Sequence, residues 1–317
     1  MLTNTFSWSP SRHRMFDACK RRYYYNYYGS WGGWGKTADP EPRLLYRLKK
    51  ITTLPQLIGT VVHETIDRAL NALKSGQELP VEVAEKSCLK AFDQRLQESE
   101  RGDWKNNPSR ATNLFEHYYD DPPTEAVLRE IRPLIVQHIR TFYTSDLYTS
   151  FKALPAFAWL SQETLDSFTF GGYTIWVTLD LAVHQNDKLC IYDWKTGSER
   201  TPDKTQLAVY ALYASKKFHT PLENLVLTDF YLKDQRLKPV AIDADTLEAT
   251  GHFILESIES MQARLSNPTA NIAEADQFPM TDHTTLCKTC PFKAACYPDT
   301  ESEQAPRQES EQLTLNF

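Results

Sequence analysis

The stretch Gly171-Gly-Tyr-Thr-Ile-Trp-Val-Thr-Leu-Asp-Leu-Ala-Val-His-Gln-Asn-Asp-Lys-Leu-Cys-Ile-Tyr-Asp-Trp-Lys-Thr-Gly197 decides the fold. It has two runs rich in β-branched and aromatic residues, separated by Asn-Asp at 186–187, a pair that tolerates the positive φ of a two-residue hairpin turn. The turn predicts strands over 173–183 and 188–194 whose paired residue numbers add up to 373, the sum of 186 and 187. Asp180 then lies opposite Asp193, and Lys195 shares the face of Asp193 because side chains alternate along a strand.

Two carboxylates and an amine on one face predict a site for a divalent cation. Opposed like charges destabilise a strand pair, and Mg²⁺ or Mn²⁺ between Asp180 and Asp193 would remove that repulsion. The Lys195 ammonium is then placed to orient an attacking water or to stabilise charge on a phosphate. The alternative is a structural Asp–Lys ion pair at a strand end, but the apolar residues at 189–192 favour a buried cation site.

At these residues the chain resembles the RecB-like branch of the PD-(D/E)xK nuclease superfamily. Asp180 matches the first metal-binding acid of that family, and Asp193 and Lys195 match its D-x-K motif. The resemblance implies an α/β fold, with a restriction-endonuclease-like mixed sheet flanked by helices. It also implies a catalytic site in which the two aspartates bind the metal, the Trp194 carbonyl adds a ligand and Lys195 acts on the water or the phosphate.

Two further motifs agree with the resemblance in order and spacing. Gly59-Thr-Val-Val-His63 matches the family's G-x-x-x-H motif, whose histidine binds metal, on a helix expected over 57–73. Gln206-Leu-Ala-Val-Tyr210 matches its Q-x-x-x-Y motif, and these two catalytic candidates lie one turn apart on a helix expected over 205–217. The alternatives are a packed histidine beside the buried stripe and an exposed polar face.

Length and composition fit a globular enzyme. The chain has 317 residues, of which 41% are hydrophobic and 24% charged, and its net charge is −6. We expect a soluble cytoplasmic protein without a membrane partner, because no charged start precedes an apolar run and no apolar stretch is long enough to cross a bilayer. In that compartment the six cysteines are not expected to form disulfides.

The N-terminal region points to DNA. Residues 10–50 contain ten Lys and Arg against three acids, a local charge of +7. Ser9 and Pro10 predict the start of a single helix that runs to Tyr28, and its arginines are candidates for phosphate contacts with single-stranded DNA or DNA ends. Its aromatic residues fit a core stripe better than a base-stacking surface.

The following segment, 29–37, nearly spells a P-loop, but Ser30 stands where the motif needs glycine and no strand precedes it. We therefore expect a flexible loop without an ATP site. A chain without a P-loop cannot unwind DNA by itself, so strand separation would need a helicase partner.

Three cysteines near the end, Cys287, Cys290 and Cys296, have a C-x2-C-x5-C spacing that predicts a metal site lacking one ligand. Cys88 lies in a helix and Cys190 in an apolar strand, and both are better interpreted as core residues, which leaves Cys19.

This four-cysteine pattern resembles the iron-sulfur RecB-like nucleases, including the CRISPR-associated exonucleases and the AddB nuclease domain. The resemblance implies a [4Fe-4S] cluster that joins the N- and C-terminal segments. Zinc is the rival occupant, because the spacing alone does not exclude it.

The chain divides into an N-terminal helical DNA-entry and cluster segment (1–57), a nuclease core (58–275) with a helical insertion at about 75–150, a cluster segment (276–298) and a tail (299–317). Strand 225–232 and helices 44–50, 81–97, 124–143 and 246–265 complete the expected elements.

The last six residues contain Gln312, Leu315 and Phe317 after a polar stretch and resemble the bacterial sliding-clamp binding motif. The alternative is an edge strand or an apolar chain end.

Together these patterns predict a metal-dependent DNA nuclease, and more narrowly an exonuclease on single strands or duplex ends, in repair, recombination or phage defence. Two alternatives remain: a non-catalytic iron-sulfur DNA-binding subunit of a helicase-nuclease complex, and a nuclease that acts on RNA.

Overall fold

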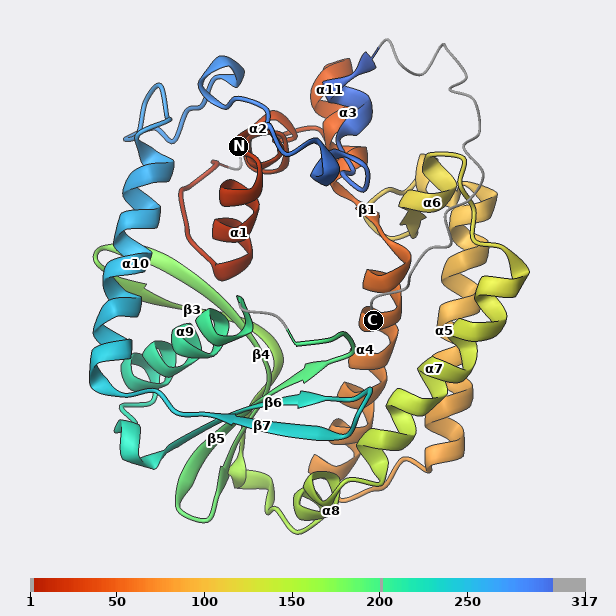
Figure 1. Ribbon diagram of the computed structural model, residues 1–317, viewed down its shortest axis with the longest axis vertical. Helices are drawn as coiled ribbons and strands as arrows, with labels where there is room; N and C mark the ends of the chain where they lie inside the picture. Colours follow the sequence, from red (N-terminus) through yellow and green to blue (C-terminus); the bar gives the residue numbers. More distant parts are fainter. Residues whose placement is uncertain (1–2, 200–201, 299–317) are drawn as a thin grey trace.

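The computed structural model describes residues 3–199 and 202–298. At its centre is a five-stranded mixed sheet with helices on both faces (Figure 1). In order across the sheet, the strands are β3 (Trp159–Phe170), β4 (Tyr173–Gln185), β5 (Lys188–Lys195), β6 (Leu225–Tyr231) and β7 (Arg236–Val240). Neighbours are antiparallel except β5 and β6, which are parallel because the connection through α9 (Pro202–Lys217) carries the chain back. The predicted mixed α/β class is confirmed.

The β4–β5 hairpin has the predicted register. Leu181 pairs with Tyr192, and the later pairs keep the same sum of 373. The turn residues Asn186 and Asp187 have φ of 52° and 59°, as a two-residue turn requires. Counted from the turn, the last pair of the β4–β5 ladder is Leu181 with Tyr192, next to Asp180 and Asp193.

The two faces of the sheet carry separate hydrophobic cores. One core packs against α4 (Leu54–Lys74), α5 (Val81–Arg101), α7 (Glu125–Tyr143) and α8 (Asp146–Lys152). The other packs against α9, α1 (Pro10–Ala18) and α10 (Ala244–Gln262). On α4, Ile58, Val62 and Ile66 are buried and His63 is partly exposed at the border of that stripe, as predicted.

Short elements make the connections. They are α2 (Lys20–Tyr24), η1 (Tyr25–Gly29), α3 (Pro40–Lys49), the parallel pair β1 (Ile51–Thr52) and β2 (Asn113–Leu114), η2 (Asp103–Lys105), α6 (Phe115–Tyr118), η3 (Ala156–Ala158), η4 (Leu222–Asn224), η5 (Ala275–Gln277), η6 (Thr284–Cys287) and α11 (Lys293–Cys296).

The prediction of one helix from Pro10 to Tyr28 is wrong. Cys19 is extended, with φ of −162°, and its Sγ accepts the Arg22 N–H at 3.4 Å as the cap of α2. Arg12 is also not exposed for phosphate contact, because it is buried with its guanidinium carbon 4.0 Å from the centre of the Tyr27 ring.

The segment 29–37, expected as a flexible loop, forms a series of turns. Successive turns are closed by backbone hydrogen bonds from Trp31 to Tyr28 (2.8 Å), from Gly33 to Ser30 (3.1 Å) and from Gly35 to Gly32 (2.9 Å). Gly33 packs so tightly on the start of α3 that a Cβ would lie 2.0 Å from the Pro42 carbonyl oxygen, so side chains are excluded there.

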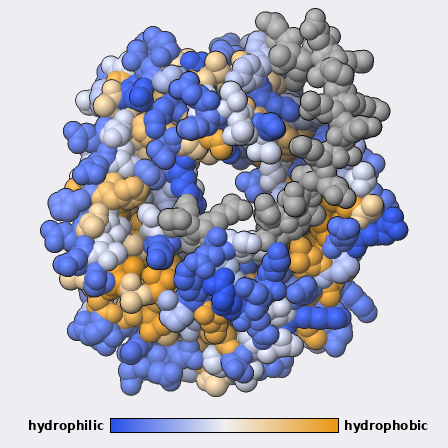
Figure 2. Space-filling model, in the orientation of Figure 1, coloured by the Kyte–Doolittle hydropathy of each residue, from blue (hydrophilic) through white to orange (hydrophobic). Residues whose placement is uncertain are grey.

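Figure 2 shows an opening through the middle of the molecule, between the sheet and the N-terminal helices. α4 runs along one side of it, and α3, η1, α2 and α1 continue round to the sheet (Figure 1). The chain before α1 closes this ring, because Trp8 forms a bridge to Ile175 of β4 and exchanges backbone hydrogen bonds of 2.9 and 2.8 Å with Thr174 and Trp176.

The predicted clamp motif at Gln312, Leu315 and Phe317 lies outside the described residues. Among the described residues, no helix is both long and apolar enough to cross a bilayer.

Candidate active site

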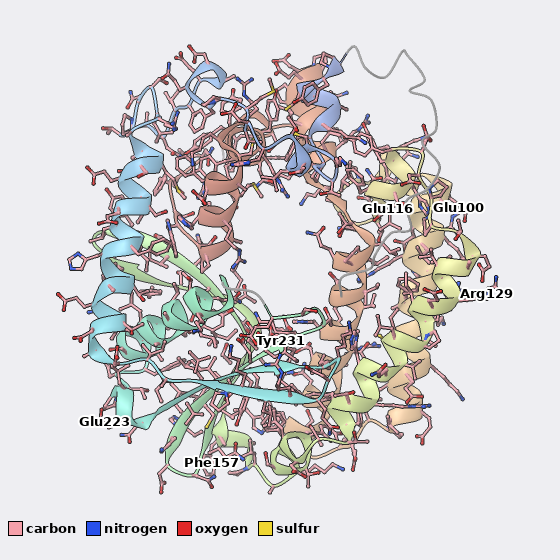
Figure 3. The ribbon with its side chains drawn as sticks, in the orientation of Figure 1. Glu100, Glu116, Arg129, Phe157, Glu223 and Tyr231 are labelled. Atoms are coloured by element: carbon pink, nitrogen blue, oxygen red, sulfur yellow. The ribbon has the colours of Figure 1, made fainter. Side chains whose placement is uncertain are left out.

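Most of the predicted site residues meet where β4 and β5 lie between α4 and α9. α4 supplies His63, β4 supplies Asp180, and β5 supplies Asp193 and Lys195. Lys195 is in register with Tyr231, the last residue of β6, which Figure 3 labels at the border of the opening. The site therefore lies beside the opening.

His63 is held between two carboxylates. Its Nδ1 lies 3.5 Å from Asp180 Oδ1 and 3.4 Å from Glu163 Oε1. One ligand atom from each of the three residues lies within 4.8 Å of the others. Burial alone would lower the pKa of His63, but Asp180 and Glu163 outweigh it and raise that pKa well above the usual value. Burial raises the pKa of Asp180 to about 6; the His63 ring opposes this shift and the Asp193 carboxylate adds to it.

Glu163 was missed by the sequence reasoning. It lies on β3, between Gln162 and Thr164, which pair with Leu181 and Leu179 on either side of Asp180. Its φ is 45°, a left-handed conformation that is strained for a residue with a side chain. The polar run around it has no strand periodicity, so the one signal in the sequence is an acid in the segment before the hairpin.

Asp193 has partners on both oxygens. Oδ1 accepts hydrogen bonds from Gln206 Nε2 (2.9 Å) and the Tyr210 hydroxyl (3.2 Å), and Oδ2 lies 2.5 Å from Lys195 Nζ. The Tyr210 oxygen also accepts from Gln206 Nε2 at 2.6 Å and lies 2.6 Å from the Thr178 carbonyl oxygen. Burial, Asp193 and Asp180 raise the pKa of Tyr210 well above its usual value, so its hydroxyl is neutral. The Q-x-x-x-Y pair thus contacts the carboxylate of Asp193.

Asp229 is a second acid that the sequence reasoning missed. Parallel pairing puts it beside Asp193, it is buried, and its Oδ1 lies 3.8 Å from Lys195 Nζ. The ammonium of Lys195 therefore lies near carboxylates from two neighbouring strands.

The backbone of Trp194, between Asp193 and Lys195, is held in place by Asp180. Its N–H donates to Asp180 Oδ2 at 2.6 Å. Its ring is buried in the opposite core, with its centre 5.4 Å from that of Phe142 and 6.1 Å from that of Tyr192. The predicted alternation of faces along β5 is confirmed.

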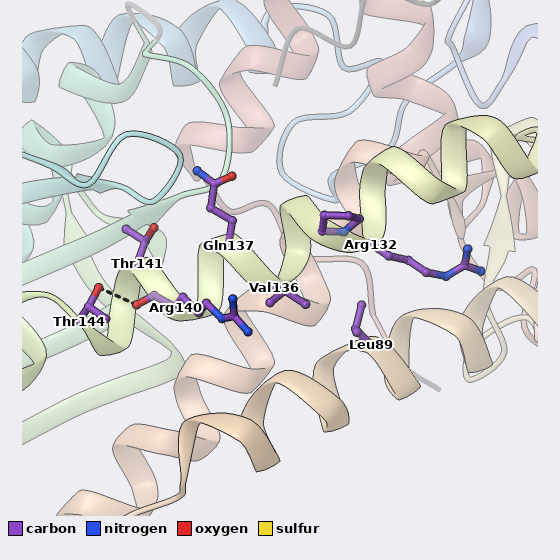
Figure 4. A pocket seen from close by; sticks show the side chains of 8 residues that line it. Leu89, Arg132, Val136, Gln137, Arg140, Thr141 and Thr144 are labelled. Carbon is purple, nitrogen blue, oxygen red and sulfur yellow. Dashed lines mark hydrogen bonds between the residues drawn. The ribbon is translucent and has the colours of Figure 1, made fainter.

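A cavity of about 840 Å³ leads along α4 to the site. Its lining includes Gln56, Gly59, His63, Asp67 and Glu163. A separate cavity of about 530 Å³ lies between α5 and α7 (Figure 4) and contains none of the predicted site residues.

The four cysteines of the predicted cluster line one small cavity: Cys19, Cys287, Cys290 and Cys296. Burial raises the pKa of the Cys290 thiol, and it raises that of Cys296 to about 11, with smaller contributions from the neighbouring cysteines. Cys88 and Cys190, in contrast, are buried in the hydrophobic core, as predicted.

Comparison with known proteins identifies a family. The family model described as "PD-(D/E)XK nuclease superfamily" matches residues 7–297. No protein of curated function matches the chain. A solved structure described as "Crystal structure of SSO0001" is similar at 16% identity over 64% of this chain and 83% of that chain, with a TM-score of 0.28 that is too low to support an argument.

Proposed function

Because the chain belongs to the PD-(D/E)XK nuclease superfamily, we propose that it is a divalent-metal-dependent deoxyribonuclease that degrades single-stranded DNA or duplex ends. One observation carries the proposal: a histidine and two carboxylates converge within 4.8 Å beside an Asp–Lys pair. That arrangement combines a cation site with a positive charge for the phosphate.

The donor set fits Mg²⁺ or Mn²⁺. His63, Glu163 and Asp180 offer one nitrogen and carboxylate oxygens, which suit these cations. Glu163 Oε1 is buried and has no hydrogen-bond partner among the described residues. A cation would compensate both this oxygen and the repulsion of two buried carboxylates. Asp193 and the Trp194 carbonyl are the further ligands that we propose.

The other residues have separate roles. The bound cation would polarise the phosphate and lower the pKa of a bound water. Lys195 would stabilise the negative charge that develops on the reacting phosphate. Gln206 and Tyr210 orient Asp193 through the hydrogen bonds to its Oδ1, and Asp229 helps to position Lys195 from the neighbouring strand.

The opening supports a preference for strand ends. The described elements close a ring around it, and α4, which carries His63, runs along one side (Figures 1 and 2). A single strand threaded through a closed ring must enter by an end, which favours exonuclease action.

The four cysteines would hold a [4Fe-4S] cluster. Cys19 lies at the break between α1 and α2, and the other three lie in the C-terminal segment, so a cluster would join the N-terminal and C-terminal segments of the chain. The two segments are in contact next to Cys19, since Arg21 donates from Nε to the Phe278 carbonyl oxygen at 2.7 Å and from its backbone N–H to the Pro279 carbonyl oxygen at 3.0 Å. The role of the cluster would be structural.

Zinc is the rival occupant of the cavity that the four cysteines line, because thiolates hold either metal, and the metal content of the purified protein distinguishes the two.

The partners that we propose are DNA, a helicase that supplies single strands, and a sliding clamp bound by Gln312, Leu315 and Phe317. Repair, recombination or phage defence are the matching processes. Titration of a peptide of residues 308–317 against the clamp tests the last partner, and loss of binding on Phe317→Ala would support it.

The decisive test uses end-labelled linear single-stranded DNA, duplex DNA and RNA, and a circular single strand, with Mg²⁺, Mn²⁺ or EDTA. We expect metal-dependent cleavage of the linear single strand and resistance of the circle. Cleavage of the circle would refute the threading argument alone. Preferred cleavage of RNA would change the substrate, and no cleavage of any nucleic acid would refute the proposed function.

A further inference from the structure

Two tryptophans in the turn segment 29–37, before α3, are exposed. Trp31 and Trp34 are 39% and 45% accessible to solvent. Their ring centres are 5.0 Å apart in an edge-to-face arrangement, and Trp34 lies 5.9 Å from the ring of Tyr46 on α3. Large aromatic surfaces are normally buried, so two exposed tryptophans beside a half-buried tyrosine indicate a binding surface.

The loop presents these rings on a fixed frame. Gly32 has a φ of +79°, and Gly33 lies against Pro42, as described above. The Arg43 guanidinium donates to the carbonyl oxygens of Lys36 and Ala38, each at 2.9 Å, and closes the base of the loop. A frame held in this way loses little conformational freedom when a ligand binds.

The surroundings are basic. Residues 31–50 contain five Lys and Arg against two acids, a net charge of +3. Lys36 and Lys50 are exposed, and Lys50 Nζ lies 5.4 Å from the centre of the Tyr46 ring. A ligand that suits this surface has flat faces and negative charge. Duplex DNA buries its base faces in the stack, whereas a single strand offers both the bases and the phosphates.

α3 lies across the opening from the sheet that carries the active site (Figure 1). We propose that Trp31, Trp34 and Tyr46 form a stacking platform for unpaired bases of single-stranded DNA, away from the site of cleavage. The platform specifies the substrate of the proposed nuclease and in that sense rests on the proposed function. It assigns to 29–37 a role in binding DNA instead of nucleotide.

Binding can be measured apart from cleavage. The probe is a fluorescent twenty-residue oligothymidylate in EDTA, followed by anisotropy with the full chain. A matched probe of the same length has abasic sites throughout, so it keeps the phosphates and lacks the bases. Wild type should bind the abasic probe at least tenfold more weakly, since each missing base removes a stacking contact. Equal affinity for the two probes would overturn the platform without any variant.

Variants then locate the contact. Trp31→Ala and Trp34→Ala should each weaken binding of oligothymidylate about tenfold and leave the abasic probe within twofold, while Trp34→Phe keeps most of the affinity. Phe157 is the matched control: it is 83% exposed and lies near the opposite end of the molecule (Figure 3), so Phe157→Ala should bind like wild type. If the tryptophan variants bind oligothymidylate as tightly as wild type, the platform is refuted. Any DNA contact then lies elsewhere, and the exposed rings would be a surface for a protein partner.

Hydrolysis of bis(p-nitrophenyl) phosphate with Mn²⁺ separates this inference from the proposed function. The compound is too small to reach from the active site to the platform, so the tryptophan variants should hydrolyse it at the wild-type rate. Wild type that hydrolyses neither this compound nor DNA, yet prefers the probe with bases, would refute the nuclease and keep the platform.

Discussion

Replacing Tyr210 with phenylalanine tests whether the Q-x-x-x-Y pair acts through Asp193. The tyrosine hydroxyl lies 3.2 Å from Asp193 Oδ1 and 2.6 Å from both Gln206 Nε2 and the Thr178 carbonyl oxygen. Phenylalanine keeps the ring and its packing and removes only these contacts. Gln206 remains as a partner of Oδ1, so the carboxylate should be less firmly oriented but still present.

The contacts of the Tyr210 hydroxyl allow two expected effects to be estimated, the loss of unfolding free energy and the loss of activity. The Tyr210 O–H carries one proton for two nearby acceptors, Asp193 Oδ1 and the Thr178 carbonyl oxygen, so its removal costs the net value of one hydrogen bond, about 0.5–1.5 kcal/mol of unfolding free energy. A residue that orients a metal-binding carboxylate typically contributes about 10–100-fold to activity or metal affinity. This range corresponds to about 1.4–2.8 kcal/mol in the barrier. We therefore expect kcat to fall in that range and the Mn²⁺ concentration for half-maximal activity to rise.

Tyr213 is the matched control on the same helix. It is buried, and its hydroxyl lies 2.7 Å from Asp166 Oδ2, a carboxylate that is not among the site residues. Tyr213→Phe should lose a similar unfolding free energy in urea titrations but retain wild-type kcat and metal dependence. The reasoning is refuted if Tyr210→Phe stays within threefold of wild-type activity, or if both variants lose activity in proportion to their stability.

Four other changes test separate features. Lys195→Ala should lower cleavage by about 100-fold or more and leave DNA affinity in EDTA within about twofold, because the ammonium acts on the reacting phosphate; unchanged cleavage would remove it from the mechanism. Asp229→Asn should lower kcat about tenfold with little change in KM, because it positions Lys195 from 3.8 Å away, and a change confined to KM would contradict that role. His138 is buried with no hydrogen-bond partner for either ring nitrogen among the described residues, and burial lowers its pKa from 6.5 to about 4. The unfolded chain then takes up a proton first as the pH falls below 6.5, so stability in urea should drop by about 2 kcal/mol between pH 7.5 and 5, and His138→Leu should remove that drop. Anaerobically purified protein should be brown with a broad band at roughly 400 nm, and Cys19→Ala should lose the colour and lower the melting temperature together, whereas colourless protein with stoichiometric zinc would contradict the cluster.

The hairpin could be predicted because its register is a local property. Asn186 and Asp187 adopt the positive φ of a two-residue turn, and such a turn allows one alignment of the strands. The face of Asp180, Asp193 and Lys195 follows from that alignment. The border position of His63 could also be predicted, since the stripe of α4 repeats with the helical period.

The helix prediction for the N-terminal region was wrong because the conformation there depends on a distant contact. The run from Pro10 to Tyr28 has caps and residues compatible with one helix, and the break at Cys19 has no local sequence signal. In the fold, the chain turns there so that the Cys19 side chain lines the cavity shared with Cys290. A distant contact therefore decides the local conformation.

Glu163 and Asp229 mark the limit of reasoning from one strand pair. Strand 225–232 was expected, but β5 and β6 are parallel and joined through α9, and a crossover of that length does not fix which residues become neighbours. Glu163 belongs to a polar strand without periodicity, and its carboxylate approaches His63 from an irregular, left-handed position.

Glu163 and Asp229 both lie close to residues that were predicted, so folding adds negative charge to a site that already had two aspartates. Such a concentration of buried carboxylates destabilises a protein unless cations compensate it, and Lys195 supplies one positive charge at the Asp193–Asp229 side. On the other side, Glu163 and Asp180 raise the pKa of His63, so the protonated ring compensates them in the metal-free protein, and a metal ion bound by the His63 nitrogen would take the place of that proton.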